Sequence, residues 1–178
     1  MKKSILLLIV VLAMGIMSGC GNKNENEQSN VPADNTPKES KFEEKDGLLV
    51  YLDLKNSPFE ESGLNISIKK GEDGYADFVK TDLKGNETKD YYKFDYSTNT
   101  VEKYYYVSAM GTAYYYYYDL EKDELSKVED GDHNDVTEKM KSSGRWDSAA
   151  EKAAEEIKSL QDYFKEKYGS TIEEAVLQ

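Results

Sequence analysis

Residues 100–120 read TVEKYYYVSAMGTAYYYYYDL and contain eight of the fifteen tyrosines in this 178-residue chain. Aromatic residues favour strands, and successive side chains of a strand point to opposite faces of the sheet. We therefore predict strands over Thr100–Ala109 and Thr112–Leu120. In the second strand, Tyr114, Tyr116 and Tyr118 belong to one face and Tyr115 and Tyr117 to the other. One face of the sheet must then carry aromatic side chains away from the main core.

The same alternation extends through residues 47–130. Period-two patterns run from Leu48 to Leu54, where Leu49, Tyr51 and Asp53 alternate with apolar residues, and from Leu64 to Ile68, where the alternating residues are polar. Further strands are predicted over Tyr75–Asp82, Lys89–Tyr96 and Leu125–Glu129. Short polar breaks separate the segments, so neighbouring strands should pair antiparallel. Aspartates end several segments, where their side chains can start a turn. We expect an antiparallel β-meander of six or seven strands, as a twisted or partly rolled sheet.

The last 48 residues, 131–178, indicate helices. Three segments resemble capping boxes, beginning at Asp135, Ser148 and Ser170. The strongest predicted helix is Ser148–Tyr168, in which Ala153, Ile157, Leu160 and Phe164 belong to one apolar stripe. We expect this helix to cover one face of the meander, which gives an α+β fold and leaves the opposite face open.

The N-terminus predicts an export signal. Lys2 and Lys3 precede a short apolar run, Ile5–Met17, that is shorter than a typical membrane span. The following residues, Met17-Ser18-Gly19-Cys20, resemble the lipobox of bacterial lipoproteins. The resemblance implies that Cys20 carries lipid and starts the mature chain, which would be extracytoplasmic and anchored to the cell membrane. An uncleaved N-terminal anchor is the alternative.

Composition separates a polar segment from a globular domain in the rest of the chain. Residues 20–46 comprise the cysteine and a polar stretch that cannot bury enough surface to fold, so we predict a disordered tether there. A single globular domain should follow over residues 47–178, after a signal peptide over 1–19. Scarce arginine beside abundant lysine, asparagine and tyrosine suggests a low-GC, Gram-positive source.

Charge and residue types exclude several functions. The net charge of −12 opposes binding to nucleic acid. His133 is the only histidine, and its acidic surroundings suggest a solvated turn. Asp130, Asp132 and Asn134 have the spacing of a calcium loop, but Asp135 and Lys141 stand where that loop needs glycine and glutamate. We expect no cofactor, no metal site and no recognisable catalytic residues.

The tyrosines are therefore the best candidates for function. They could simply pack across strands, or they could form a platform for recognition, because rigid amphipathic rings favour binding. On the second view, Tyr104, Tyr106, Tyr115 and Tyr117 form the binding face. The chain would then be a non-enzymatic binding or accessory lipoprotein with a protein, peptide or glycan ligand at the cell surface. A small cell-envelope hydrolase with an unrecognised site is the alternative.

Overall fold

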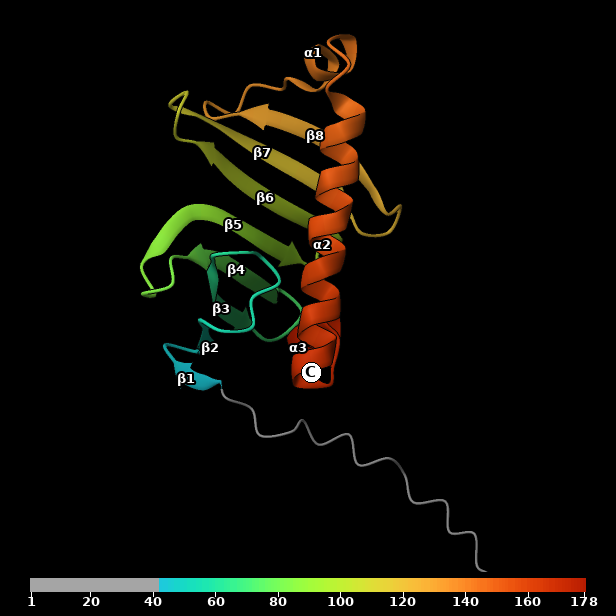
Figure 1. Cartoon of the computed structure of the whole chain (residues 1–178). Helices are drawn as coiled ribbons and strands as arrows, with labels where there is room; N and C mark the ends of the chain where they lie inside the picture. Colours follow the sequence, from blue (N-terminus) through green and yellow to red (C-terminus); the bar gives the residue numbers. More distant parts are fainter. Residues whose placement is uncertain (1–41) are drawn as a thin grey trace, which may run out of the picture. The chain divides into compact units, whose positions relative to one another are not determined.

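The computed structural model of the chain describes residues 42–178. They form one antiparallel sheet whose strands pair in the order of the sequence, with helices on one side (Figure 1). The strands are β1 (Glu43–Lys45), β2 (Leu48–Asp53), β3 (Gly63–Lys69), β4 (Tyr75–Thr81), β5 (Glu87–Asp95), β6 (Thr100–Val107), β7 (Thr112–Asp119) and β8 (Glu124–Asp130). The predicted α+β meander is confirmed, but it has eight strands rather than six or seven.

The additional strand is β1, which lies in the segment predicted to be the end of the tether. It pairs with β2 through a two-residue turn, Asp46-Gly47, in which both residues have positive φ angles of 53° and 79°. Two such residues form the turn that best matches the twist of a hairpin. Phe42, just before β1, packs against Tyr51 and Tyr168 with ring-centroid distances of 5.7 and 5.0 Å. The folded domain therefore includes residues 42–46, and the predicted signal peptide, Cys20 and the rest of the tether lie outside the described residues.

Aspartates end the strands as predicted. The Asp82 carboxylate accepts hydrogen bonds from the backbone N–H groups of Lys84 and Asn86, and Asp119 accepts from Glu121 and Lys122. These bonds satisfy backbone donors that leave the ladder and hold each turn in place.

The helices are α1 (Thr137–Ser142), α2 (Trp146–Tyr168) and α3 (Ile172–Leu177). Helix α2 begins at Trp146, two residues before the predicted start, and Ser148 is not its cap. It ends at Tyr168, and Gly169 follows as its C-cap with a left-handed φ of 75°. The capping box of α3 joins Thr171 and Glu174, one residue later than predicted. Within residues 42–178, no helix is long and apolar enough to span a membrane.

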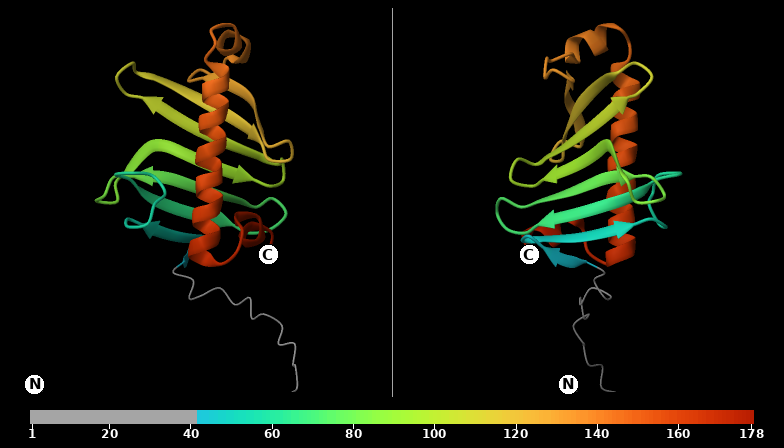
Figure 2. Two further views of the ribbon diagram at one scale, coloured as in Figure 1. Left: turned by 45° about the vertical axis from the view of Figure 1, so that its right-hand side comes forward. Right: turned by 90° about the vertical axis from the view of Figure 1, so that its left-hand side faces the viewer.

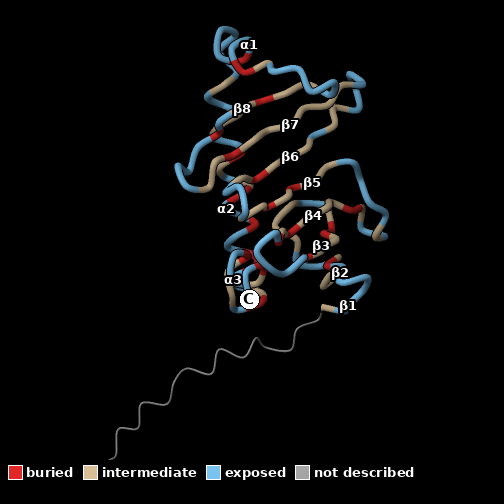
Figure 3. Tube along the Cα trace, turned by 180° about the vertical axis from the view of Figure 1, so that it is seen from behind, coloured by how far each residue is buried: buried red, intermediate tan, exposed pale blue. Residues whose placement is uncertain are grey.

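The core lies between α2 and one face of the sheet. Figure 2 shows α2 running across the strands on that face, and Figure 3 shows buried positions alternating with less buried ones along the strands. The predicted stripe of α2 is buried, with Leu160 fully inaccessible. The sheet contributes the apolar residues Leu64, Ile66, Ile68, Phe78, Phe94, Val101 and Val128 to the core. Helix α2 therefore covers one face of the sheet, and no helix covers the other face.

Candidate functional site

The strand register places all four predicted site residues on the face that α2 does not cover. Tyr104 of β6 pairs with Tyr115 of β7, and paired residues lie on the same face. The next register pair, Tyr105 and Tyr114, belongs to the opposite face. Tyr106 and Tyr117 share the face of Tyr104 and Tyr115 by alternation. We call this uncovered surface the open face.

None of the four tyrosines is sealed in the core. Tyr104, Tyr106, Tyr115 and Tyr117 are each half-buried, whereas Tyr118 on the helix face is 3% exposed. The predicted division of the tyrosine run between two faces is therefore correct. Tyr104 and Tyr115 contact each other, whereas the Tyr106 and Tyr117 rings lie under the ammonium groups of Lys89 and Lys127.

An aromatic ladder crosses the open face. The Tyr91 and Tyr104 rings stack at 5.5 Å with an interplanar angle of 11°, and Tyr104 lies 4.9 Å from Tyr115. Tyr115 in turn stacks on His133 at 4.4 Å and 24°. Such pairs contribute about 0.5–1.5 kcal/mol each beyond their buried area. The ladder thus ties three strands to the loop after β8.

Stacking decides which parts of the rings a ligand can reach. The Tyr91–Tyr104 and Tyr115–His133 pairs stack face to face, so each of these rings has one face covered, whereas the Tyr104 and Tyr115 rings are tilted by 56°. Tyr104 and Tyr115 make no side-chain hydrogen bond within the described residues, so their hydroxyls can donate and accept. The surface offers hydroxyl groups for hydrogen bonding beside rings that already stack on one face.

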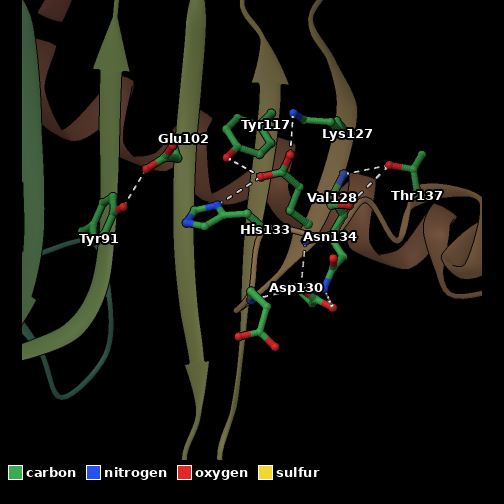
Figure 4. A network of polar contacts seen from close by, with 11 residues as sticks. Tyr91, Glu102, Tyr117, Lys127, Val128, Asp130, His133, Asn134 and Thr137 are labelled. Atoms are coloured by element: carbon green, nitrogen blue, oxygen red, sulfur yellow. Dashed lines mark hydrogen bonds and ion pairs between the residues drawn. The ribbon is translucent and has the colours of Figure 1, made fainter.

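The Glu129 carboxylate contacts three polar side chains at the β7–β8 end of the open face. Figure 4 shows this cluster. Glu129 accepts a hydrogen bond from the Tyr117 hydroxyl at 2.9 Å and one from the Lys127 ammonium at 2.8 Å. His133 Nδ1 lies 3.3 Å from the same carboxylate. The bond from Lys127, followed by that from Tyr117, lowers the pKa of Glu129.

His133 is as exposed as the sequence suggests, but it has the partners Tyr115 and Glu129, which the sequence did not indicate. A histidine in contact with a carboxylate supplies two of the three members of a hydrolytic triad. Among the described residues, no serine or threonine hydroxyl bonds to the ring, so the nucleophile is missing from this arrangement. Asp130 beside it closes its own turn by accepting from the N–H groups of Asp132 and Asn134.

A row of charged residues runs parallel to the ladder. The register pairs Asp77 with Lys93 and Lys93 with Glu102 across β4, β5 and β6. The Tyr91 hydroxyl donates to Glu102 at 2.6 Å. Lys93 directs its ammonium over the Tyr75 ring, 4.6 Å from the centroid. Asp77, which sequence reasoning did not single out, makes no hydrogen bond or ion pair within residues 42–178.

The Asp77 carboxyl has a perturbed environment. It is half-buried, and burial raises its pKa from 3.8 to about 6, against the opposing effect of Lys93. Alternation with Ala76 and Phe78 would have placed Asp77 on the open face. Its loss of water depends on neighbours from other strands, which no local pattern reveals.

The helix face carries a different polar pair. Lys103 of β6 forms a salt bridge with Glu156 of α2 under the helix, next to the Tyr92 ring. Burial lowers the pKa of Lys103, and Glu156 opposes that effect. Because each charge has the other as its partner, the pair belongs to the packing of α2 on the sheet.

Three hollows lie at the margins of the sheet, with volumes of about 520, 440 and 440 Å³. Tyr106 lines one of them, but Tyr104, Tyr115 and Tyr117 line none of the three. No group of three or more metal-ligating side chains gathers within the described part of the chain. Two of the hollows are lined in part by α2 and α3, on the covered side of the sheet, so the candidate site is an aromatic and charged surface and not one of these hollows.

No known family model matches this chain, and neither a curated protein nor a solved structure matches it. Its function must be inferred from the site.

Proposed function

We propose that this chain is a lipid-anchored, extracytoplasmic binding protein that captures a protein or peptide partner on its open face. The observation that carries the proposal is the placement of Tyr104, Tyr106, Tyr115 and Tyr117 together on a face without a helix. Tyrosine is enriched in protein interfaces because each ring combines apolar area with a polar tip. The lipobox-like segment ending at Cys20 supports the anchor and the location.

The geometry favours a polypeptide ligand over a glycan. A sugar ring binds aromatic side chains through their faces, and the Tyr91–Tyr104 and Tyr115–His133 stacks already cover one face of each of these rings. A polypeptide has backbone and side-chain groups that can bond to hydroxyls presented in a row. Hydrolysis is not proposed, since the His133–Glu129 contact lacks a nucleophile within residues 42–178.

Site-specific photo-cross-linking tests the proposal. The photoreactive residue p-benzoylphenylalanine replaces Tyr104 or, as the matched control, its neighbour Tyr105 in the bacterium that carries the gene. The two positions are adjacent in β6 and face opposite sides of the sheet. We expect a cross-linked partner from position 104 and little from position 105. Equal yields from the two positions, or adducts from 105 alone, would contradict a binding role for the open face.

A pair of double variants gives a second measure. Tyr104→Ser with Tyr115→Ser removes one register pair, and Tyr105→Ser with Tyr114→Ser removes the next pair on the helix face. The first double variant should lose the partner in a binding assay and the second should keep it. Circular dichroism spectra of the two variants provide the control for folding.

A further inference from the structure

One of the three hollows lies beside helix α1, and the functional site described above does not account for it. Its walls come from the end of β6, the start of β7, the turn after β8, helix α1 and Arg145. Figure 1 shows α1 beyond β8, at one end of the domain. The volume of about 440 Å³ is within the range of small-ligand pockets, about 300–1,000 Å³. We call it the α1 hollow.

A buried hydroxyl without a partner belongs to the wall of the α1 hollow. Thr112 lines the hollow, and within residues 42–178 its hydroxyl is the one buried side-chain polar atom that makes no hydrogen bond. Buried polar groups are normally paired, because losing water without a replacement is unfavourable. Rotation about χ1 moves a threonine hydroxyl between staggered positions, so it can turn toward a group that enters the hollow. Thr112 therefore points to a ligand that forms a hydrogen bond there.

The only arginine of the chain, Arg145, lines the same hollow. Its Nε donates to the Ser143 hydroxyl at 2.9 Å. Within residues 42–178 the guanidinium makes no ion pair, although the chain contains 35 acidic residues. The planar guanidinium can bind a carboxylate through two parallel hydrogen bonds. Arg145 thus indicates a carboxylate as the charged part of the ligand.

The other charged residues of the α1 hollow leave Arg145 available. The Asp130 carboxylate accepts from backbone N–H groups of its own turn, and the nearby Lys139 offsets its charge. Asp132 is exposed and makes no ion pair with Arg145. Its carboxylate can accept a hydrogen bond from an N–H group of the ligand.

The remaining wall of the hollow is apolar. Ala113 of β7, Val136 and Met140 line it, and Met140 is buried. A small inorganic anion would leave this wall in contact with water. An organic carboxylate with an apolar side chain would cover the wall and gain the free energy of burying apolar surface.

We propose that the α1 hollow binds an α-carboxylate next to an apolar side chain, as found in a free amino acid or at the C-terminus of a polypeptide. The carboxylate bonds to the Arg145 guanidinium and the Thr112 hydroxyl, and the side chain packs against Val136 and Met140. Asp132 accepts from the N–H group on the same α-carbon. This site does not depend on the proposed function, because none of these residues belongs to the tyrosine ladder.

The test uses purified full-length protein in a nonionic detergent and three probes. N-acetyl-L-leucine represents a chain terminus, L-leucine represents a free amino acid, and N-acetyl-L-leucine amide lacks the carboxylate. Isothermal titration calorimetry measures each affinity, and the fluorescence of Trp146, the only tryptophan, reports binding beside Arg145. The variants are Arg145→Gln and Thr112→Val. Lys84→Gln, in the exposed turn after β4, has the same net charge as Arg145→Gln and is its control.

We expect one of the two acids to bind wild type at least tenfold more tightly than the amide, and the tighter acid identifies the source of the carboxylate. Its affinity should fall at least tenfold in Arg145→Gln and less than twofold in Lys84→Gln. Thr112→Val should bind at least threefold more weakly and should unfold no more easily in urea, because it removes a hydroxyl that has no partner.

Three results would overturn the inference. The first is that neither acid binds more tightly than the amide, and the second is an equal loss of affinity in Arg145→Gln and Lys84→Gln. The third is a Thr112→Val variant that binds as wild type does or unfolds more easily, since the hydroxyl would then have no role in binding or a partner in the fold. Cross-linking at Tyr104 and Tyr105 tests the open face separately.

Discussion

Removing the charge of Asp77 should make the protein more stable at neutral pH, which is unusual for a substitution in a sheet. The pKa of Asp77 rises from 3.8 to about 6 on folding because of burial. Each unit corresponds to about 1.4 kcal/mol, so the full shift would amount to about 3 kcal/mol of lost stability. The carboxyl keeps partial contact with water, which reduces the expected gain for Asp77→Asn to about 1–2 kcal/mol.

The sign of the pH dependence follows from proton binding. Between pH 3.8 and about 6 the folded state holds a proton on Asp77 that the unfolded state has released. Wild type therefore loses this part of its stability as pH rises through that range. The asparagine variant has no such group. Its advantage should be greatest above pH 6 and should vanish below pH 4.

Urea denaturation at pH 7.5, 5.5 and 4.0 measures this difference. Asp73→Asn, in the exposed turn between β3 and β4, is the control for removing an acidic charge from an acidic protein. An Asp77→Asn variant that is no more stable than wild type at pH 7.5 would refute the reasoning. The same holds if its advantage is independent of pH, or if Asp73→Asn gains as much stability.

Two other predictions address the core and the anchor. Leu160→Ala should lower the free energy of unfolding by about 2–5 kcal/mol, because Leu160 is fully buried between α2 and the sheet, whereas exposed Ser159→Ala should change it little; a loss below about 0.5 kcal/mol in urea melts would contradict this packing. Cys20→Ala should abolish labelling by a radioactive fatty acid and release the protein from membranes in a Gram-positive host; an unlabelled variant that matures to the same size and remains attached would rule out lipidation at Cys20.

The alternation of residues was enough to predict most strands and the two faces of β6 and β7. In β2 the apolar set Leu48, Val50 and Leu52 does not face the core: Leu52 is 44% exposed, whereas Asp53 is buried. Alternation did not predict β1, because Glu43, Glu44 and Lys45 include no apolar residue that could alternate with a polar one. The Asp46-Gly47 pair was the available signal for that hairpin. The start of α2 was also displaced, because the helix extends back to Trp146 without a side-chain cap.

The site was partly predictable for a similar reason. Periodicity assigns each tyrosine to a face, so the grouping of Tyr104, Tyr106, Tyr115 and Tyr117 follows from local sequence. Stacking and desolvation depend on which strands become neighbours and on the register between them. The contact of His133 with Tyr115 and the desolvation of Asp77 therefore had to come from the three-dimensional structure.

The order of the strands also bears on how an anchored protein could use its open face. The described chain begins beside β1, at one edge of the sheet, whereas the tyrosine ladder crosses β5, β6 and β7. Five strand steps separate β1 from β6, which is about 24 Å at the usual spacing. An anchor that precedes Phe42 would join the domain at the edge farther from the ladder. In the proposed arrangement the attachment and the candidate binding surface occupy different halves of one sheet, so that a partner can reach the tyrosines while the domain stays tethered.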